Sequence, residues 1–375
     1  MALFPLRNLI VAMLCAGVFW QVGSQSAAGQ SQPEMTVEIA YKKKKYIGQP
    51  LVWDGKDMMI LRRDGKISIL PVKSEKDYKK IKSSFTPYSS SDMRIRLQKE
   101  FGSKYQVSVT QNFLVVHPNG NSGVWSAPFQ KLYVRFGAYF DSRGFDLKKP
   151  EFQMVAVVLR TRKEFDRFLR RYHPDAGTNV LGYYSPRSNR IITYDQTGGN
   201  PGSQGWFFNA DTIIHEATHQ TAFNTGVHSR YNQGLRWASE GLAMLFEAPG
   251  VNNSTYYSKQ KDRINRDRLI ALKYYYANDK VKGKMASLIA SDKLFRSNAQ
   301  LAYAMSWGMT FFFTEKMPAE YNRFLRADAR RANFSGYSSS DRAKDFAKAF
   351  GSDIRGLEAK MKRFIDKLDV PPPKK

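Results

Sequence analysis

The sequence predicts an α+β protein. A small N-terminal β module comes first, then a mixed sheet with a motif helix, and then a mainly helical C-terminal half. Short alternating or apolar runs fill positions 36–70 and are separated by Asp-Gly turns. The apolar run Gln153–Leu159 is typical of a buried strand. From residue 209 onward the patterned segments have helical spacing, and these three observations together predict the fold class.

Residues 1–28 are predicted to be a signal peptide. Arg7 precedes the apolar run Leu9–Trp20, and Ser26-Ala27-Ala28 offers a cleavage site. The run is short for a membrane span, with a retained anchor as the alternative. Cys15, the only cysteine, lies in this segment, so the mature chain would contain no thiol. We therefore expect a secreted, periplasmic or cell-envelope protein with no membrane span after cleavage.

The formal net charge of +26 favours anionic partners. The basic residues are spread along the chain, and only Lys42–Lys45 form a tight cluster. No zinc-finger spacing, RNP string or basic zipper accompanies them, so specific nucleic-acid binding is not expected. An anionic cell-envelope polymer is the partner that the charge suggests, and a solvated basic surface is the alternative.

Residues 29–92 are predicted to form a β module of SH3-like size with a linker. Asp64-Gly65 is a strong hairpin signal because both positions favour positive φ. Lys42–Lys45 are interpreted as a charged strand edge that blocks sheet pairing. Ser74–Ser91 are predicted to be a helix and linker. The expected strands are Thr36–Ala40, Tyr46–Trp53, Met58–Arg63 and Lys66–Leu70.

Residues 93–369 are predicted to form the second domain, followed by a disordered tail at 370–375. Its first part contains helices and hairpins around the buried strand: helix Met93–Phe101, hairpin Tyr105–Val109 with Phe113–His117, helix Trp125–Arg143, and hairpin Val180–Ser185 with Arg190–Tyr194. His117 is interpreted as a structural residue.

The chemistry centres on His215-Glu216-Ala217-Thr218-His219. On a helix, residues four apart share a face, so His215 and His219 would direct two imidazoles at one zinc ion. Glu216 would lie beside that point, where a base is needed to act on a water activated by zinc. Glu240, on a second helical pattern after a glycine-containing loop, supplies a third ligand and leaves a fourth position open.

The loops around the motif carry further expectations. Asn209 or Asp211 is expected to cap the motif helix, which ends at Asn224 with Gly226 following. His228 is interpreted as an exposed loop histidine, with a role in orienting substrate as the alternative.

The His-Glu-Ala-Thr-His string, with Glu240 in Ser-Glu-Gly-Leu-Ala, resembles the gluzincin (thermolysin-like) zinc metallopeptidases. The fuller strings resemble still more closely a family of secreted bacterial proteins of unknown function. The gluzincin resemblance implies a zincin-like domain, a protein or peptide substrate and Zn²⁺. It also implies that Leu181-Gly182-Tyr183 lies at a substrate-binding strand edge, with a plain sheet hairpin as the more economical alternative. It further implies that Tyr303 donates a hydrogen bond to the substrate oxyanion.

Two positions depart from that pattern. Met244 stands where the pattern has an acidic residue that orients the first histidine, and Glu247 is the candidate to replace it. Thr221 stands where such strings usually carry an apolar residue.

The predicted reaction is peptide hydrolysis with Glu216 as general base. One alternative is that the histidines are ordinary polar positions on a helix. Another is a catalytically inactive metallopeptidase-like envelope protein that binds anionic polymer or another protein. Aromatic core packing is the alternative role for Tyr303. The sequence names neither a substrate nor an oligomeric state.

Overall fold

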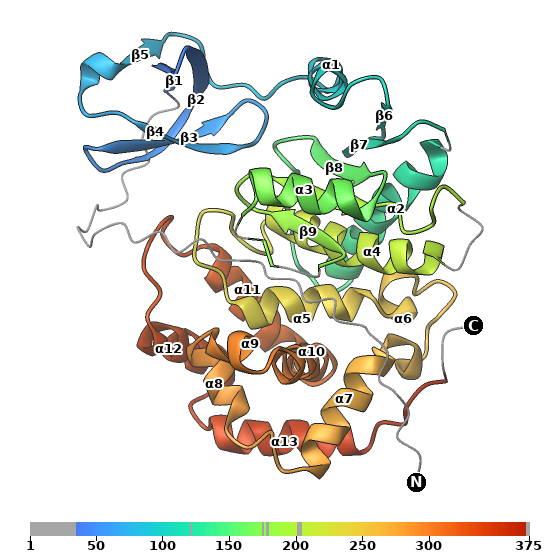
Figure 1. Ribbon diagram of the computed structural model, residues 1–375. Helices are drawn as coiled ribbons and strands as arrows, with labels where there is room; N and C mark the ends of the chain where they lie inside the picture. Colours follow the sequence, from blue (N-terminus) through green and yellow to red (C-terminus); the bar gives the residue numbers. More distant parts are fainter. Residues whose placement is uncertain (1–34, 121, 175, 178–179, 201–204, 373–375) are drawn as a thin grey trace.

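The computed structural model describes residues 35–120, 122–174, 176–177, 180–200 and 205–372. The predicted signal peptide with Cys15, and residues 373–375 of the predicted tail, lie outside the described residues. The fold is α+β, as predicted: an N-terminal sheet, a second sheet flanked by helices, and a helical C-terminal half (Figure 1).

The N-terminal sheet has five antiparallel strands in the order β4-β3-β2-β1-β5. The predicted Asp64-Gly65 hairpin joins β3 to β4, but of the two residues only Gly65 has a positive φ, 76°. Val37, Ile39 and Ile60 lie in the small core of this sheet. The strands are β1 (Thr36–Tyr41), β2 (Lys44–Trp53), β3 (Asp57–Arg62), β4 (Ile67–Pro71) and β5 (Tyr78–Ile81).

Two predictions in this region need correction. The Ser74–Ser91 segment, predicted to be a helix and linker, contains a three-residue 3₁₀ helix, Glu75–Asp77, followed by β5, a fifth strand. Its pairing with β1 is a long-range contact that the local sequence pattern does not reveal. Lys42–Lys45 form the turn between β1 and β2 and the start of β2. Because both strands are interior to the sheet, these lysines do not form a strand edge.

The second sheet has the order β6-β7-β8-β10-β9, with β8 parallel to both β7 and β10. Its strands are β6 (Tyr105–Val109), β7 (Phe113–Pro118), β8 (Met154–Leu159), β9 (Gly182–Ser185) and β10 (Arg190–Tyr194). Helices α1 (Ser90–Phe101) and α3 (Arg162–Tyr172) cover one face, and α2 (Ser122–Asp141) and α4 (Gly205–Asn224) cover the other. The apolar run of β8 alternates between the two cores, which explains why it contains no polar residue.

The C-terminal half is built around α10, whose residues from Leu301 to Phe313 are all buried. It packs against α5 and α7 (Figure 1). A Cβ at Gly241 of α5 would lie 2.1 Å from Oγ1 of Thr310, so only glycine permits this approach. The helices are α5 (Arg236–Phe246), α6 (Pro249–Asn252), α7 (Arg266–Ala277), α8 (Lys284–Ala290), α9 (Lys293–Ser297), α10 (Ala299–Lys316), α11 (Pro318–Ala329), α12 (Ser339–Phe350) and α13 (Ile354–Asp366).

The N-terminal sheet docks on the rest of the chain through its β3–β4 hairpin. Arg230 donates hydrogen bonds to the carbonyls of Gly65, at 2.6 Å, and Pro186, at 2.9 Å. The amide of Ile67 donates to the carbonyl of Arg187. Phe152 packs against Gly65 and joins a shared apolar cluster. The hairpin tip therefore contacts the turn between β9 and β10.

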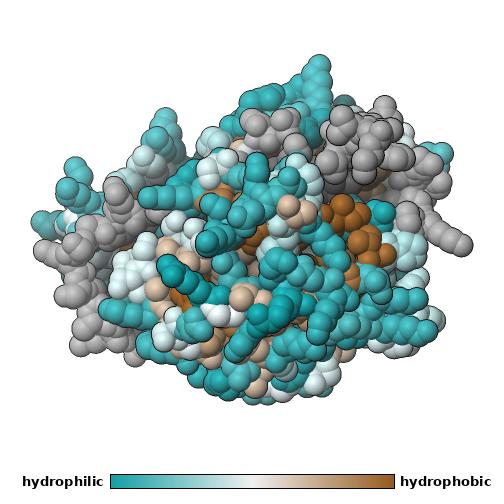
Figure 2. All heavy atoms as spheres, turned by 90° about the horizontal axis from the view of Figure 1, so that it is seen from below, coloured by the Kyte–Doolittle hydropathy of each residue, from teal (hydrophilic) through white to brown (hydrophobic). Residues whose placement is uncertain are grey.

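The face over the C-terminal helices is largely hydrophilic, as the strongly basic composition leads one to expect (Figure 2). None of the helices in the described part of the chain has the length and apolar character that crossing a membrane requires.

Candidate metal centre

Helix α4 carries the motif and begins earlier than predicted. It starts at Gly205, so Asn209 and Asp211 lie inside the helix and the predicted cap at either position is wrong. Trp206 packs edge-on against Trp125 of α2, a contact that accounts for the additional turn. Asn209 instead accepts a hydrogen bond from the amide of Gln196 and joins the preceding loop to α4.

The next residue after the second histidine secures this helix to the sheet. The Gln220 side-chain amide donates to the carbonyls of Asn189, at 2.8 Å, and Val155, at 3.2 Å. Since Gln220 is fully buried, these bonds fix the height of α4 over β8 and the β9–β10 turn.

Three predicted ligands come together between α4 and α5. Nε2 of His215 lies 3.2 Å from Nε2 of His219 and 3.4 Å from Oε2 of Glu240. The third distance, from Nε2 of His219 to Oε2 of Glu240, is 3.6 Å. Donors about 2.1 Å from a tetrahedral zinc ion are roughly 3.4 Å apart. The three donor atoms therefore have the spacing of three ligands of one such ion, and the residues fit a metal.

Glu247 orients the first histidine. Its Oε1 lies 2.6 Å from Nδ1 of His215, and its Oε2 accepts a 2.6 Å hydrogen bond from the Asn265 side chain. Glu247 follows Glu240 by two helical turns and therefore lies on the same face of the helix. Met244, at the position where the gluzincin pattern has an acidic residue, is buried in the core. The carboxylate that contacts His215 is thus Glu247, one helical turn after Met244.

The electrostatics of the centre favour a cation. Burial lowers the pKa of His215, but hydrogen bonds with Glu240 and Glu247 outweigh this effect and raise it to about 10. Burial raises the pKa of Glu240, but the hydrogen bonds with His215 and His219 bring it below its ordinary value. A buried carboxylate that stays ionised requires positive charge beside it, which an imidazolium or a divalent ion supplies.

Glu216 lies next to the ligands and is fully buried. Burial, with Glu240 nearby, raises its pKa to about 8. Strand β9 passes directly over it: a Cβ at Gly182 would lie 3.0 Å from Cγ of Glu216 and 2.6 Å from Cγ2 of Thr212. Among the described residues β9 is the terminal strand of its sheet, and it includes Gly182 and Tyr183 of the predicted Leu181-Gly182-Tyr183 edge. All four of its residues are buried, so β9 forms part of the wall of the centre, and substrate binding along it stays a prediction.

Tyr303 and Arg236 meet on the other side of Glu240. Arg236 donates a 3.2 Å hydrogen bond from Nη2 to the Tyr303 hydroxyl, and its Nε lies 3.8 Å from Oε1 of Glu240. Tyr303 is buried on α10, where its ring packs edge-on against Phe295. The predicted bond from Tyr303 to a substrate stays a prediction. Arg236 lies between the Tyr303 hydroxyl and Glu240.

The other histidines do not join the cluster. His117 is buried and bonds to the Ser108 hydroxyl and the Pro118 carbonyl, as a structural residue would. The prediction that His228 is exposed is wrong. Its ring packs against Phe223, only 5% of the residue is exposed, and burial lowers its pKa to about 3.

The sequence interpretation missed two residues of the centre, Arg236 and Asn265. Arg236 precedes Glu240 by one helical turn, a spacing that could have indicated the contact. Asn265 reaches Glu247 from α7, and no local signal points to that contact.

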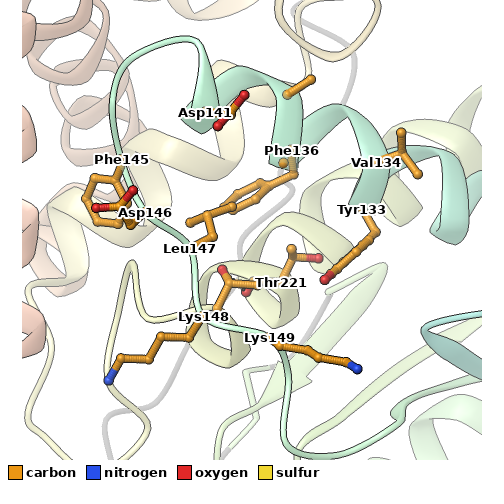
Figure 3. A pocket seen from close by; sticks show the side chains of 13 residues that line it. Tyr133, Val134, Phe136, Asp141, Phe145, Asp146, Leu147, Lys148, Lys149 and Thr221 are labelled. Carbon is orange, nitrogen blue, oxygen red and sulfur yellow. Dashed lines mark hydrogen bonds between the residues drawn. The ribbon is translucent and has the colours of Figure 1, made fainter.

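A surface pocket of about 580 Å³ lies behind α4 (Figure 3). Tyr133, Phe136 and Asp141 of α2, the 145–149 segment, and Thr221 line it. Thr221 is about 200° around the helix from His219. The pocket is therefore on the opposite side of α4 from the three ligands.

The comparisons with known proteins bear on this half of the chain. Residues 209–335, which include all five predicted site residues, match the family model described as Protein of unknown function (DUF1570). The match spans about a third of the chain and names no activity. No curated protein matches the sequence. The resemblance to a family of unknown function is confirmed for this segment, and the gluzincin assignment stays a prediction.

Proposed function

We propose that this chain is an exported zinc-dependent peptidase that hydrolyses peptide bonds at the centre formed by His215, His219 and Glu240. The spacing of these three donors beside the buried Glu216 is the observation that carries the proposal. A zinc ion held there would act as a Lewis acid and lower the pKa of a bound water.

We assign Glu216 the role of general base. It would take a proton from the attacking water and pass it to the leaving amine. A carboxyl group whose pKa is raised towards the working pH can both accept and release a proton, and burial does this for Glu216. Glu247 would hold His215 in the tautomer that presents Nε2 to the metal.

An extended peptide substrate would add to the sheet beside its terminal strand, β9. A substrate added as a further strand would run past Glu216, because Gly182 of β9 packs against that side chain. Tyr303 would donate its hydroxyl proton to the carbonyl oxygen as negative charge develops there.

A second candidate is a protein in which the metal stabilises the fold without catalysis. The burial of the centre favours it: His215 and His219 are 1% exposed, and Glu216 and Glu240 are 0% exposed. Substrate would reach such a centre only after the wall opens. The alternative of an envelope protein that binds anionic polymer belongs to the same class and rests on the net charge.

The first experiment is the metal content of the mature chain by elemental mass spectrometry, compared with that of Glu240→Ala. The proposal expects one zinc per chain and much weaker retention in the variant. Cleavage of a peptide library is then compared with that of Glu216→Gln, which should keep its zinc and lose turnover. No zinc in folded protein would overturn the peptidase and the metal-stabilised fold, and the polymer-binding alternative, which rests on the net charge, would then lead. Zinc without cleavage would favour the second.

A further inference from the structure

Arg236 is an unusually enclosed arginine next to the predicted third ligand. Its side chain is 10% exposed, although most arginines are at the surface. It precedes Glu240 by one turn of α5, and its guanidinium lies over the ring of Phe295 with Cζ 4.3 Å from the centroid. The hydrogen bond to Tyr303 holds the same group from α10. Contacts from three helices therefore fix its position.

The two oxygens of Glu240 face different partners. Oε2 points at the histidines, 3.4 and 3.6 Å from their Nε2 atoms. Oε1 points at Arg236, 3.8 Å from its Nε. The carboxylate is thus oriented with one oxygen at the metal centre and the other at a cation.

We propose that Arg236 is a positioning residue that holds Oε1 of Glu240 away from the metal, so that Glu240 binds through Oε2 alone. A carboxylate can ligate through one oxygen or through both, and a catalytic zinc site needs a vacant position besides its three protein ligands. If both oxygens of Glu240 ligated, that position would be filled or crowded. The proposal rests on the metal site of the proposed function, and it does not require peptidase activity.

The chemistry of arginine suits this role. Its guanidinium stays charged at any working pH and its planar donors have a fixed geometry. Stacking over Phe295 and the bond to Tyr303 orient the guanidinium plane and keep its positive charge at ion-pair distance from Oε1. Because Arg236 contacts both residues, it also links the orientation of Tyr303 to that of the Glu240 carboxylate.

The test is the visible spectrum of the cobalt-substituted full-length mature protein, because four-coordinate Co²⁺ absorbs more strongly than Co²⁺ with higher coordination. Arg236→Met should bind cobalt with a marked loss of band intensity, whereas Arg236→Lys, which keeps a cation, should retain most of it. Arg323→Met, at an exposed arginine of α11 that pairs with Glu320, is the control. Its spectrum should equal that of wild type.

An unchanged spectrum in cobalt-loaded Arg236→Met would overturn the proposal. If circular dichroism shows that Arg236→Met does not fold, Arg236→Gln replaces it, because glutamine keeps a donor for Tyr303 but lacks the charge. Arg236→Gln should also lose band intensity, and an unchanged spectrum would again overturn the proposal. Failure of the wild type to bind either Co²⁺ or Zn²⁺ would overturn this inference together with the proposed function. If the protein binds cobalt but lacks peptidase activity, the spectrum still decides whether Arg236 positions Glu240.

Discussion

Nδ1 of His215 and Oε1 of Glu247 meet at 2.6 Å across the packed interface of α4 and α5. Although burial opposes it, this hydrogen bond lowers the pKa of Glu247, which therefore accepts the Nδ1 proton. Nε2 is then the nitrogen that gives up a proton when a metal binds. The contact explains how a chain with Met244 in the usual acidic position can still orient its first histidine.

Glu247→Gln should weaken zinc binding by about 10- to 100-fold, the usual effect of losing the partner of a ligating histidine. The amide has nearly the same shape, but it cannot accept the Nδ1 proton as strongly. Competition with a chromogenic chelator measures the change. Glu320→Gln, which removes a surface carboxylate beside Arg323, is the control and should bind zinc as wild type does. Equal affinities in the two variants would contradict the assigned role.

Gly182→Ala should impair the centre without removing a ligand. The new Cβ would press on Thr212 and Glu216, and such overpacking costs about 1–3 kcal/mol. We expect a lower midpoint of thermal unfolding, retained zinc, and slower peptide cleavage if the proposed function holds. Gly137→Ala in α2 is the matched control. Nothing lies within 4 Å of its Cβ position, so it should be neutral or stabilising by about 1 kcal/mol. Identical behaviour of the two variants would argue against β9 as the wall of the centre.

The side-by-side placement of the candidate ligands could be predicted because it depends on helical periodicity. His215 and His219 share a face by spacing alone, and Glu247 follows Glu240 at two turns. The hairpin at Asp64-Gly65 and the apolar strand β8 are local signals of the same kind. Each of these features is determined within a few residues, so the sequence pattern was sufficient.

The missed features depend on contacts between distant segments. Strand β5 exists because it pairs with β1. The early start of α4 follows from Trp206 packing on Trp125, and Asn265, the N-cap of α7, becomes part of the centre only through its bonds to Met244 and Glu247 of a distant segment. His228 is buried because its loop folds back on Phe223. Periodicity contains no information about such pairings.

The burial of His228 predicts a pH-dependent stability. Burial lowers its pKa from 6.5 to about 3, so between these values the unfolded chain binds a proton that the folded chain does not. The free energy of unfolding should therefore fall as the pH drops below 6.5, by at most about 1.4 kcal/mol per pH unit from this group. Urea unfolding at pH 7 and pH 5 measures it. His228→Gln should lose less stability over that interval than wild type, and an equal loss would contradict the prediction.

The bridge made by Arg230 predicts that the N-terminal sheet stabilises the part of the chain that carries the candidate metal centre. Arg230 joins Gly65, at the tip of the β3–β4 hairpin, to Pro186 in the β9–β10 turn. The same turn contains Asn189, whose carbonyl accepts from Gln220, next to His219. Arg230 and Gln220 therefore attach the hairpin tip and helix α4 to the same β9–β10 turn.

Arg230→Ala should lower the free energy of unfolding by roughly 1.5–3 kcal/mol, because two bonds from a charged donor are lost and two carbonyls are left without it. Limited proteolysis should cut the 82–88 connection to the N-terminal sheet faster, and zinc should dissociate faster. Arg323→Ala, on an exposed arginine of α11, is the control and should change neither rate. Faster proteolysis with unchanged zinc dissociation would mean that the sheet is attached through Arg230 but does not support the centre.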